Sequence, residues 1–159
     1  MSYVSGLLSV ARRYEDRGVT LRLLDDSRAP SESESAWVER QIPSLFTLAI
    51  ANGQYFGGGM HVAPDARVND GLFQCVWVRG LGYAEIMRYL PALFRGKHLK
   101  LEPFHHMNAS AVELIAQRPT TIELDGEPAL TIPEGGTAEV KILKGAMRVH
   151  AGRRAPALT

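Results

Sequence analysis

The 159-residue sequence holds 45% hydrophobic and 22% charged residues, which suits one buried core and is too short to promise two. We therefore expect a single globular domain over residues 1–159, with a flexible tail at residues 151–159. Eighteen basic and seventeen acidic side chains leave a formal net charge of +1, so composition gives no sign of a nucleic-acid partner. No apolar run approaches the roughly 20 residues that cross a bilayer, and the N-terminus lacks a secretory pattern, which favours a cytoplasmic protein.

The first part of the chain predicts one helix and two strands. Residues 5–17 place apolar side chains along one helix face, and residues 19–24 are typical of a strand. Residues 25–43 are polar and interrupted by proline, so we expect a loop there. Residues 45–51 form an apolar run, which is typical of a strand covered on both faces.

A long glycine-rich connection, residues 52–71, separates these elements from the next strand, expected over residues 72–78. The only cysteine, Cys75, lies in that apolar strand, which excludes an intrachain disulfide and predicts a buried, reduced thiol. Residues 83–94 have helical spacing of apolar side chains, and Pro91 should kink or restart the helix.

From Phe104 onward, short β-like segments alternate with turn signals. The strands expected there cover residues 110–116, 120–124, 129–132, 138–143 and 147–150. Repeated short strands with close turns indicate antiparallel sheets. The predicted fold class is therefore mainly β, an antiparallel β-sandwich with two peripheral α-helices.

The connection at residues 52–71 carries the first candidate chemistry. A connection of this length in a compact domain usually has a function, although three successive glycines are also typical of a tight bend. Asp65, Asn69 and Asp70 cluster near its end, and side-chain oxygens with free carbonyls are the ligands that Mg²⁺ requires. An Asn-Asp-Gly sequence is equally a turn signal.

The second candidate lies at Asp125-Gly126, a pair typical of a two-residue hairpin turn. A hairpin accounts for these two residues but not for Glu127, which follows where the next strand begins. A carboxylate at that position is suited to remove a proton from an alcohol that attacks a γ-phosphate.

Four ordered motifs resemble one known family. They are Asn-Gly-x-x-x-Gly-Gly-Gly at 52–59, Ala-Pro-Asp-Ala-x-x-x-Asp-Gly-x-Phe at 63–73, Gly-Lys-His at 96–98 and Asp-Gly-Glu-Pro at 125–128. The pattern resembles the C-terminal half of the diacylglycerol kinase catalytic family, which includes sphingosine kinases and bacterial YegS-like lipid kinases. The resemblance implies the lipid-binding domain of an ATP-dependent kinase that phosphorylates a lipid hydroxyl, such as diacylglycerol or sphingosine.

The resemblance also implies roles for individual residues. Glu127 matches the general base of the family, and Asp125 falls in the element that lies near the nucleotide in sphingosine kinases. Asp70 matches a side-chain ligand of Mg²⁺, with main-chain oxygens of Arg67 and Leu72 as further ligands. The implied partners are a lipid alcohol, ATP, the inner face of the membrane through peripheral contact, and a second copy in a homodimer.

Two departures from the family pattern affect these expectations. Asn69 stands where the family often has a second acidic residue, which should weaken a metal site. The Gly-Gly-Asp-Gly-Thr string of the family's nucleotide-binding half is absent from the sequence, so we expect the chain alone to be inactive as a kinase.

Two other classes of protein compete with the kinase. One is a non-catalytic lipid-binding or interaction module that keeps the same fold. The other is a carbohydrate-binding sandwich, which usually displays aromatic side chains on one sheet face. A zinc site at His98, His105 and His106 is disfavoured, because adjacent histidines in a strand point to opposite faces and no fourth ligand is spaced to join them.

Overall fold

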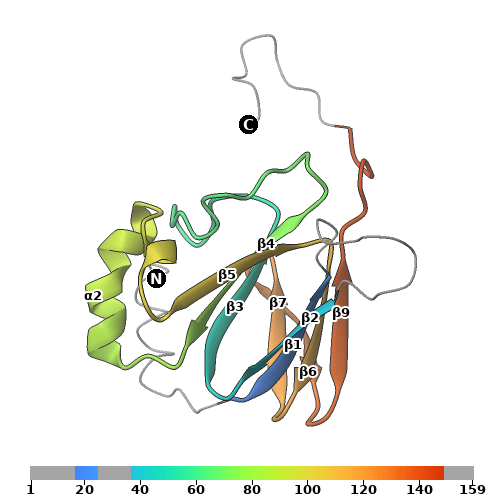
Figure 1. Cartoon of the computed structure of the whole chain (residues 1–159), viewed down its shortest axis with the longest axis horizontal. Coiled ribbons are helices and arrows are strands. Elements are labelled where there is room, and N and C mark those ends of the chain that lie inside the picture. The colour runs from blue at the N-terminus through green and yellow to red at the C-terminus, as the bar shows by residue number, and fades with distance from the viewer. Residues whose placement is uncertain (1–16, 25–36, 149–159) are drawn as a thin grey trace.

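The computed structural model describes residues 17–24 and 37–148, and these form two packed β layers with a helix beside one of them (Figure 1). The elements are β1 (Val19–Leu24), β2 (Trp37–Ile42), β3 (Leu45–Ala51), β4 (Phe73–Arg79), α2 (Tyr83–Phe94), the 3₁₀ helix η2 (His98–Lys100), β5 (Phe104–Ala109), β6 (Ala111–Ala116), β7 (Thr120–Leu124), β8 (Glu127–Ile132) and β9 (Thr137–Lys141). The predicted β-sandwich class is confirmed. The helix expected over residues 5–17 lies, apart from Arg17, outside the described residues.

All strand pairs are antiparallel. One sheet has the order β2-β1-β6-β9, the other has the order β3-β4-β5, and β7 and β8 form a separate hairpin. The chain passes from the second sheet to the first at Ser110, a single buried residue between β5 and β6. Its N–H donates to Leu24 O and its carbonyl accepts from Ile142 N, so the corner is tied to both neighbouring strands of the first sheet.

The main core lies between the two sheets. Alternate residues of β1 (Val19, Leu21 and Leu23) are fully buried, as expected for a strand with one face on a core. They form one cluster with apolar side chains of β4 and β6. Burying a side chain of this size contributes roughly 1.5–3 kcal/mol, so this cluster stabilises the sandwich most.

Strand β4 is buried on both faces, because it is the middle strand of its sheet and is covered on each side. Cys75 and Trp77 point into the core between the sheets, whereas Val76 and Val78 belong to clusters on the other face. The prediction of a buried thiol is confirmed, and burial raises the pKa of Cys75 to about 12.

The prediction of a loop throughout residues 25–43 is wrong for its last part, where β2 occupies residues 37–42. The strand was missed because it is the edge of its sheet and exposes Glu39, Arg40 and Gln41, so its sequence lacks an apolar pattern. It is held to β1 by antiparallel backbone hydrogen bonds and by an ion pair in which Arg22 Nε lies 3.8 Å from Glu39 Oε2. Residues 25–36 lie outside the described part of the chain.

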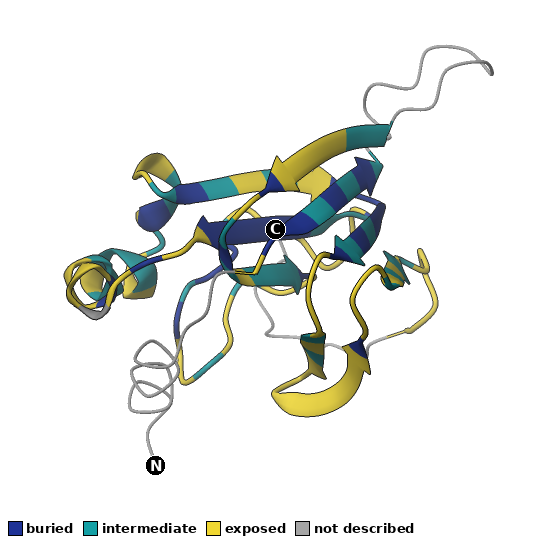
Figure 2. Ribbon diagram, turned by 90° about the horizontal axis from the view of Figure 1, so that it is seen from below, coloured by how far each residue is buried: buried dark blue, intermediate teal, exposed yellow. Residues whose placement is uncertain are grey.

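Helix α2 is confirmed at the predicted residues and continues unbroken through Pro91 instead of restarting there. Glu85 accepts a hydrogen bond of 2.9 Å from Gly82 N at the helix start. At the other end, Gly96 adopts a positive φ of 64°. Gly96 N donates to Leu93 O and Lys97 N to Ala92 O, the two hydrogen bonds of a Schellman motif. Figure 2 shows buried residues concentrated in the sheets and exposed ones on the outer side of α2.

Two further expectations differ from the structure at the C-terminal side. Strand β5 was not predicted as a separate element, because its His-His-Met-Asn centre carries few apolar side chains. The strand expected over residues 147–150 is wrong for its described part, since Met147 and Arg148 are exposed and lie in no strand. Strand β8 begins at Glu127, as expected from the Asp-Gly turn before it.

Candidate functional site

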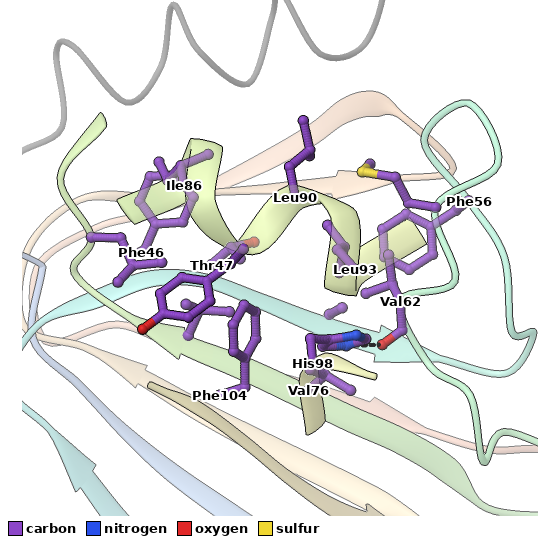
Figure 3. Close-up of a pocket in the computed structure, with 15 residues that line it drawn as sticks. Phe46, Thr47, Phe56, Val62, Val76, Ile86, Leu90, Leu93, His98 and Phe104 are labelled. Carbon is purple, nitrogen blue, oxygen red and sulfur yellow. Dashed lines mark hydrogen bonds between the residues drawn. The ribbon is translucent and has the colours of Figure 1, made fainter. Parts of the chain in front are cut away.

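An apolar pocket of about 140 Å³ lies between helix α2 and the outer face of the β3-β4-β5 sheet (Figure 3). The sheet forms its floor, α2 its roof, and the loop between β3 and β4 closes one end. Its lining residues are Phe46, Thr47, Ala49, Phe56, Met60, Val62, Val76, Val78, Leu81, Ile86, Tyr89, Leu90, Leu93, His98 and Phe104. Almost all of these side chains are apolar, so the pocket is suited to a hydrocarbon group.

Among the described residues of the pocket wall, His98 contributes the one imidazole, and it is fully buried. Its Nε2 lies 3.0 Å from Val62 O, to which it donates in the matching tautomer, and this joins η2 to the β3-β4 loop. The ring also packs edge-on against Phe104, with centroids 5.0 Å apart. Burial is the main cause that lowers the pKa of His98, so the side chain is neutral at physiological pH.

The loop between β3 and β4 is ordered by its own hydrogen bonds. Phe56 and Met60 form an isolated antiparallel bridge, and the three glycines between them all have positive φ, so they make the tight bend that their sequence indicated. The loop then approaches α2 closely at His61. A Cβ on Gly96 would come within 2.5 Å of the His61 ring, so the glycine that ends α2 also permits this contact.

The predicted metal-binding residues lie together at the end of this loop. Asp70 Oδ1 accepts a hydrogen bond of 2.9 Å from Leu72 N, which leaves Oδ2 outside this bond. Arg67 is three positions earlier in the same exposed turn. Among the described residues, no group of three His, Cys, Asp or Glu side chains could hold a metal ion. A cation here would depend on one carboxylate, main-chain carbonyls and water, a donor set that fits Mg²⁺ or Ca²⁺.

Asp65, the other acid of the loop, has a structural partner. Gln74, which is only 1% exposed, donates from Nε2 to Asp65 Oδ2 and accepts from Asp65 N through Oε1. This pair anchors the loop to the first residues of β4. Sequence reasoning did not identify Gln74, although a glutamine inside an apolar strand is a signal that a buried polar partner is needed.

The candidate base lies on the β7-β8 hairpin. Asp125 and Gly126 have φ values of 52° and 89°, which both central residues of a type I′ turn require. Leu124 pairs with Glu127 across this turn, so the predicted hairpin is confirmed and Glu127 stands at its mouth. The hairpin is largely exposed, and Ile122 and Ile132 attach it to the main core.

The structure brings Arg67, Asp70 and Leu72 together in one turn and places Asp125 beside Glu127 in another. In the part of the chain that is described, no hydrogen bond or ion pair connects the two turns. The residues that line the pocket were not identified from the sequence. Their signal was the largely apolar sequence of β4, whose alternate residues face two different environments.

No described helix is long and apolar enough to cross a membrane.

Comparison with known proteins agrees with this architecture. A "probable lipid kinase YegS-like" protein of Chromohalobacter salexigens is 32% identical over 90 residues, which is 57% of this chain and 29% of that protein. A diacylglycerol kinase of Bacillus subtilis is 28% identical over 89 residues, which is 56% of this chain and 29% of that protein. The matched part is thus less than a third of either relative.

A crystal structure of a diacylglycerol kinase from Bacillus anthracis str. Sterne shares the fold. Its TM-score is 0.55 at 16% sequence identity, and the match covers 88% of this chain and 44% of that one. Residues 1–151 match the family described as "YegS C-terminal NAD kinase beta sandwich-like domain". The chain therefore belongs to this family, the C-terminal domain of lipid and diacylglycerol kinases.

Proposed function

We propose that this chain is the lipid-binding part of an ATP-dependent kinase that phosphorylates a lipid hydroxyl. The observation that supports the proposal most is the apolar pocket between α2 and the β3-β4-β5 sheet. It offers a lipid chain a dry environment with few polar groups that would lose hydrogen bonds on binding. ATP as the co-substrate implies that the enzyme works on the cytoplasmic side of the membrane.

The size of the pocket limits how much of a lipid it can enclose. At about 140 Å³, the pocket is smaller than the roughly 300–1,000 Å³ of sites that enclose a drug-sized ligand, so it would cover only part of a long acyl chain. The rest of the substrate must extend through the mouth. The apolar lining favours a hydrocarbon chain over a small polar metabolite, whose hydrogen bonds to water would be lost in the pocket.

In the proposed reaction, the Glu127 carboxylate accepts the proton of the lipid hydroxyl. The hydroxyl oxygen then attacks the γ-phosphorus of ATP, the bond from that phosphorus to the β,γ-bridging oxygen breaks, and ADP leaves. Asp125, in the same turn, would lie near the nucleotide. Mg²⁺, bound by Asp70 and by the carbonyls of Arg67 and Leu72, would supply positive charge at the domain's oxygen-rich loop. The ATP-binding half would come from elsewhere in the complete protein.

Exchange of Glu127 for Gln in the complete protein tests this function. Gln keeps the size of the side chain but accepts no proton, so turnover should fall by roughly 10²- to 10⁴-fold, with little change in the KM values for lipid and ATP. Glu123→Gln, on the exposed neighbouring strand β7, is the matched control and should retain turnover. Steady-state kinetics and melting curves of both variants give the measurement.

A pocket-filling variant separates lipid binding from chemistry. Ala49→Trp places a large ring in the pocket from β3 and should weaken lipid binding while ATP affinity is kept. If Glu127→Gln turns over normally while Ala49→Trp still abolishes lipid binding, the chain is a lipid-binding module without the proposed base. Unchanged lipid binding in a folded Ala49→Trp variant would remove the pocket from the proposal.

A further inference from the structure

We propose that the rim of the pocket is a docking surface for an anionic lipid bilayer, formed by one flank of α2 and the tip of the β3-β4 loop. This rests on the proposed function, because it assumes that the pocket receives a lipid. The surface places the mouth of the pocket directly against the membrane from which a substrate would enter.

The apolar part of this surface is a stripe along α2. Met87, Leu90 and Phe94 follow one another at spacings of three and four residues, which aligns them on one side of the helix. Met87 is 43% and Phe94 40% exposed, while Leu90 between them lines the pocket. The stripe therefore runs from the pocket outward instead of into the core.

The loop continues the apolar surface on the other side of the mouth. Phe56, which also lines the pocket, is 45% exposed, and Tyr55 is 61% exposed. Figure 3 shows Phe56 at the end of the pocket beside the loop and Leu90 on the helix above the pocket. Exposed aromatic and long apolar side chains around a cavity mouth mark an interaction site.

Charge accompanies the apolar stripe. Between residues 82 and 102 the sequence has four exposed cationic side chains and two carboxylates, so this segment is positive although the whole chain has a net charge of only +1. The cations are Arg88, Arg95, Lys97 and Lys100. One of the two carboxylates, that of Glu85, accepts the hydrogen bond from Gly82 N at the helix start.

The arrangement of these groups fits a bilayer better than a protein partner. Arg88 and Arg95 each follow a member of the stripe by one residue, so a cationic row runs parallel to the apolar row along the helix. Apolar side chains at one depth and cations at another match the acyl and head-group layers of an anionic membrane. The small volume of the pocket adds to this, because the uncovered remainder of a lipid chain would stay in the bilayer.

Co-sedimentation of the complete protein with vesicles that contain no lipid alcohol substrate tests the docking surface. We compare vesicles of phosphatidylcholine alone with vesicles that also contain phosphatidylglycerol. Met87→Ser combined with Phe94→Ser should weaken binding to the anionic vesicles at least tenfold. Arg88→Gln combined with Arg95→Gln should weaken it roughly ten- to thirtyfold and reduce the preference for phosphatidylglycerol.

Leu124→Ser combined with Leu130→Ser is the matched control, since both leucines are exposed on the β7-β8 hairpin and neither lines the pocket. This control should bind vesicles as the parent does. Parent-like binding by the folded Met87→Ser/Phe94→Ser variant would overturn the proposal. So would equal loss in the hairpin control, or binding abolished by millimolar glycerol phosphate, which would indicate a soluble head-group site.

A second assay keeps this inference distinct from the proposed kinase. On a soluble short-chain lipid alcohol, the α2 variants should retain turnover, because the chemistry does not need the bilayer. If the kinase proposal is wrong, the parent protein should show no turnover of this substrate while it still binds vesicles. If the docking proposal is wrong, the α2 variants should bind vesicles as the parent does, and turnover should also be unchanged.

Discussion

The walls of the pocket and the hairpin that carries Glu127 differ in how they are held. In β4, which forms the pocket floor, five successive residues are buried, whereas in β8 only Ile132 is buried. The pocket is thus part of the packed interior, and the candidate base lies on an exposed projection. We therefore expect ligand binding to depend on the folded core of this domain, and substitutions in the hairpin to have little effect on stability.

Truncation of the core tests this contrast with the largest effect. Leu23→Ala removes a fully buried side chain between the sheets and should lower the free energy of unfolding by about 2–5 kcal/mol. Denaturant unfolding of the parent and the variant provides the measurement. Because β4 belongs to the same core, affinity for a lipid chain should fall along with stability.

The same truncation on the hairpin is the matched comparison. Leu130 is 51% exposed in β8, so Leu130→Ala should change the free energy of unfolding by no more than about 0.5 kcal/mol. Similar losses at Leu23 and Leu130 would show that the hairpin contributes to the stability of the fold as much as the core does.

Acid provides a third comparison, because two described histidines have lowered pKa values: His98 in the pocket wall and His105, which stacks on Trp77. Burial is the main cause for both His98 and His105. As the pH falls through 6.5, the ordinary pKa of histidine, the unfolded chain takes up protons that the folded chain resists. The stability contributed by the neutral rings is therefore complete above that pH and is lost below it.

Melting curves between pH 5.5 and 7.5 measure this loss, which should be smaller than that of the core truncation. His98→Asn keeps a donor for Val62 O but has no titrating group, so its stability should depend less on pH than that of the parent. An identical dependence in the parent and in His98→Asn would assign the effect to other groups.

A smaller stabilisation than that of the core side chains is expected from metal ions. If Mg²⁺ binds at Asp70, a concentration about five times the dissociation constant should add about 1 kcal/mol to the free energy of unfolding. Asp70→Ala should lose this increment. Asn69→Ala, which changes the neighbouring residue without removing a carboxylate, is the matched control and should keep it. Thermal melts with Mg²⁺ and with chelator make the comparison, and an equal metal response in both variants would exclude Asp70.

The sequence predicted those parts of the molecule in which one local rule dominates. The apolar runs of β3 and β4, the helical spacing of α2 and the Asp125-Gly126 turn all agree with the structure. The edge strand β2 could not be predicted in this way, because its neighbours and not its own side chains keep it extended. The pocket also could not be predicted from the sequence, because its walls come from segments that are brought together only by tertiary packing.

The reactivity of the Cys75 thiol can report how often the two sheets separate. It is the only cysteine in the chain, it is fully buried, and its pKa of about 12 keeps almost no thiolate at neutral pH. A thiol reagent can therefore react with Cys75 only when the two sheets separate. The rate of modification is thus a measure of how often the sandwich opens. Cys75 lies in β4, whose other face forms the pocket floor. A ligand that stabilises the packed layers by filling the pocket should therefore slow the modification of Cys75.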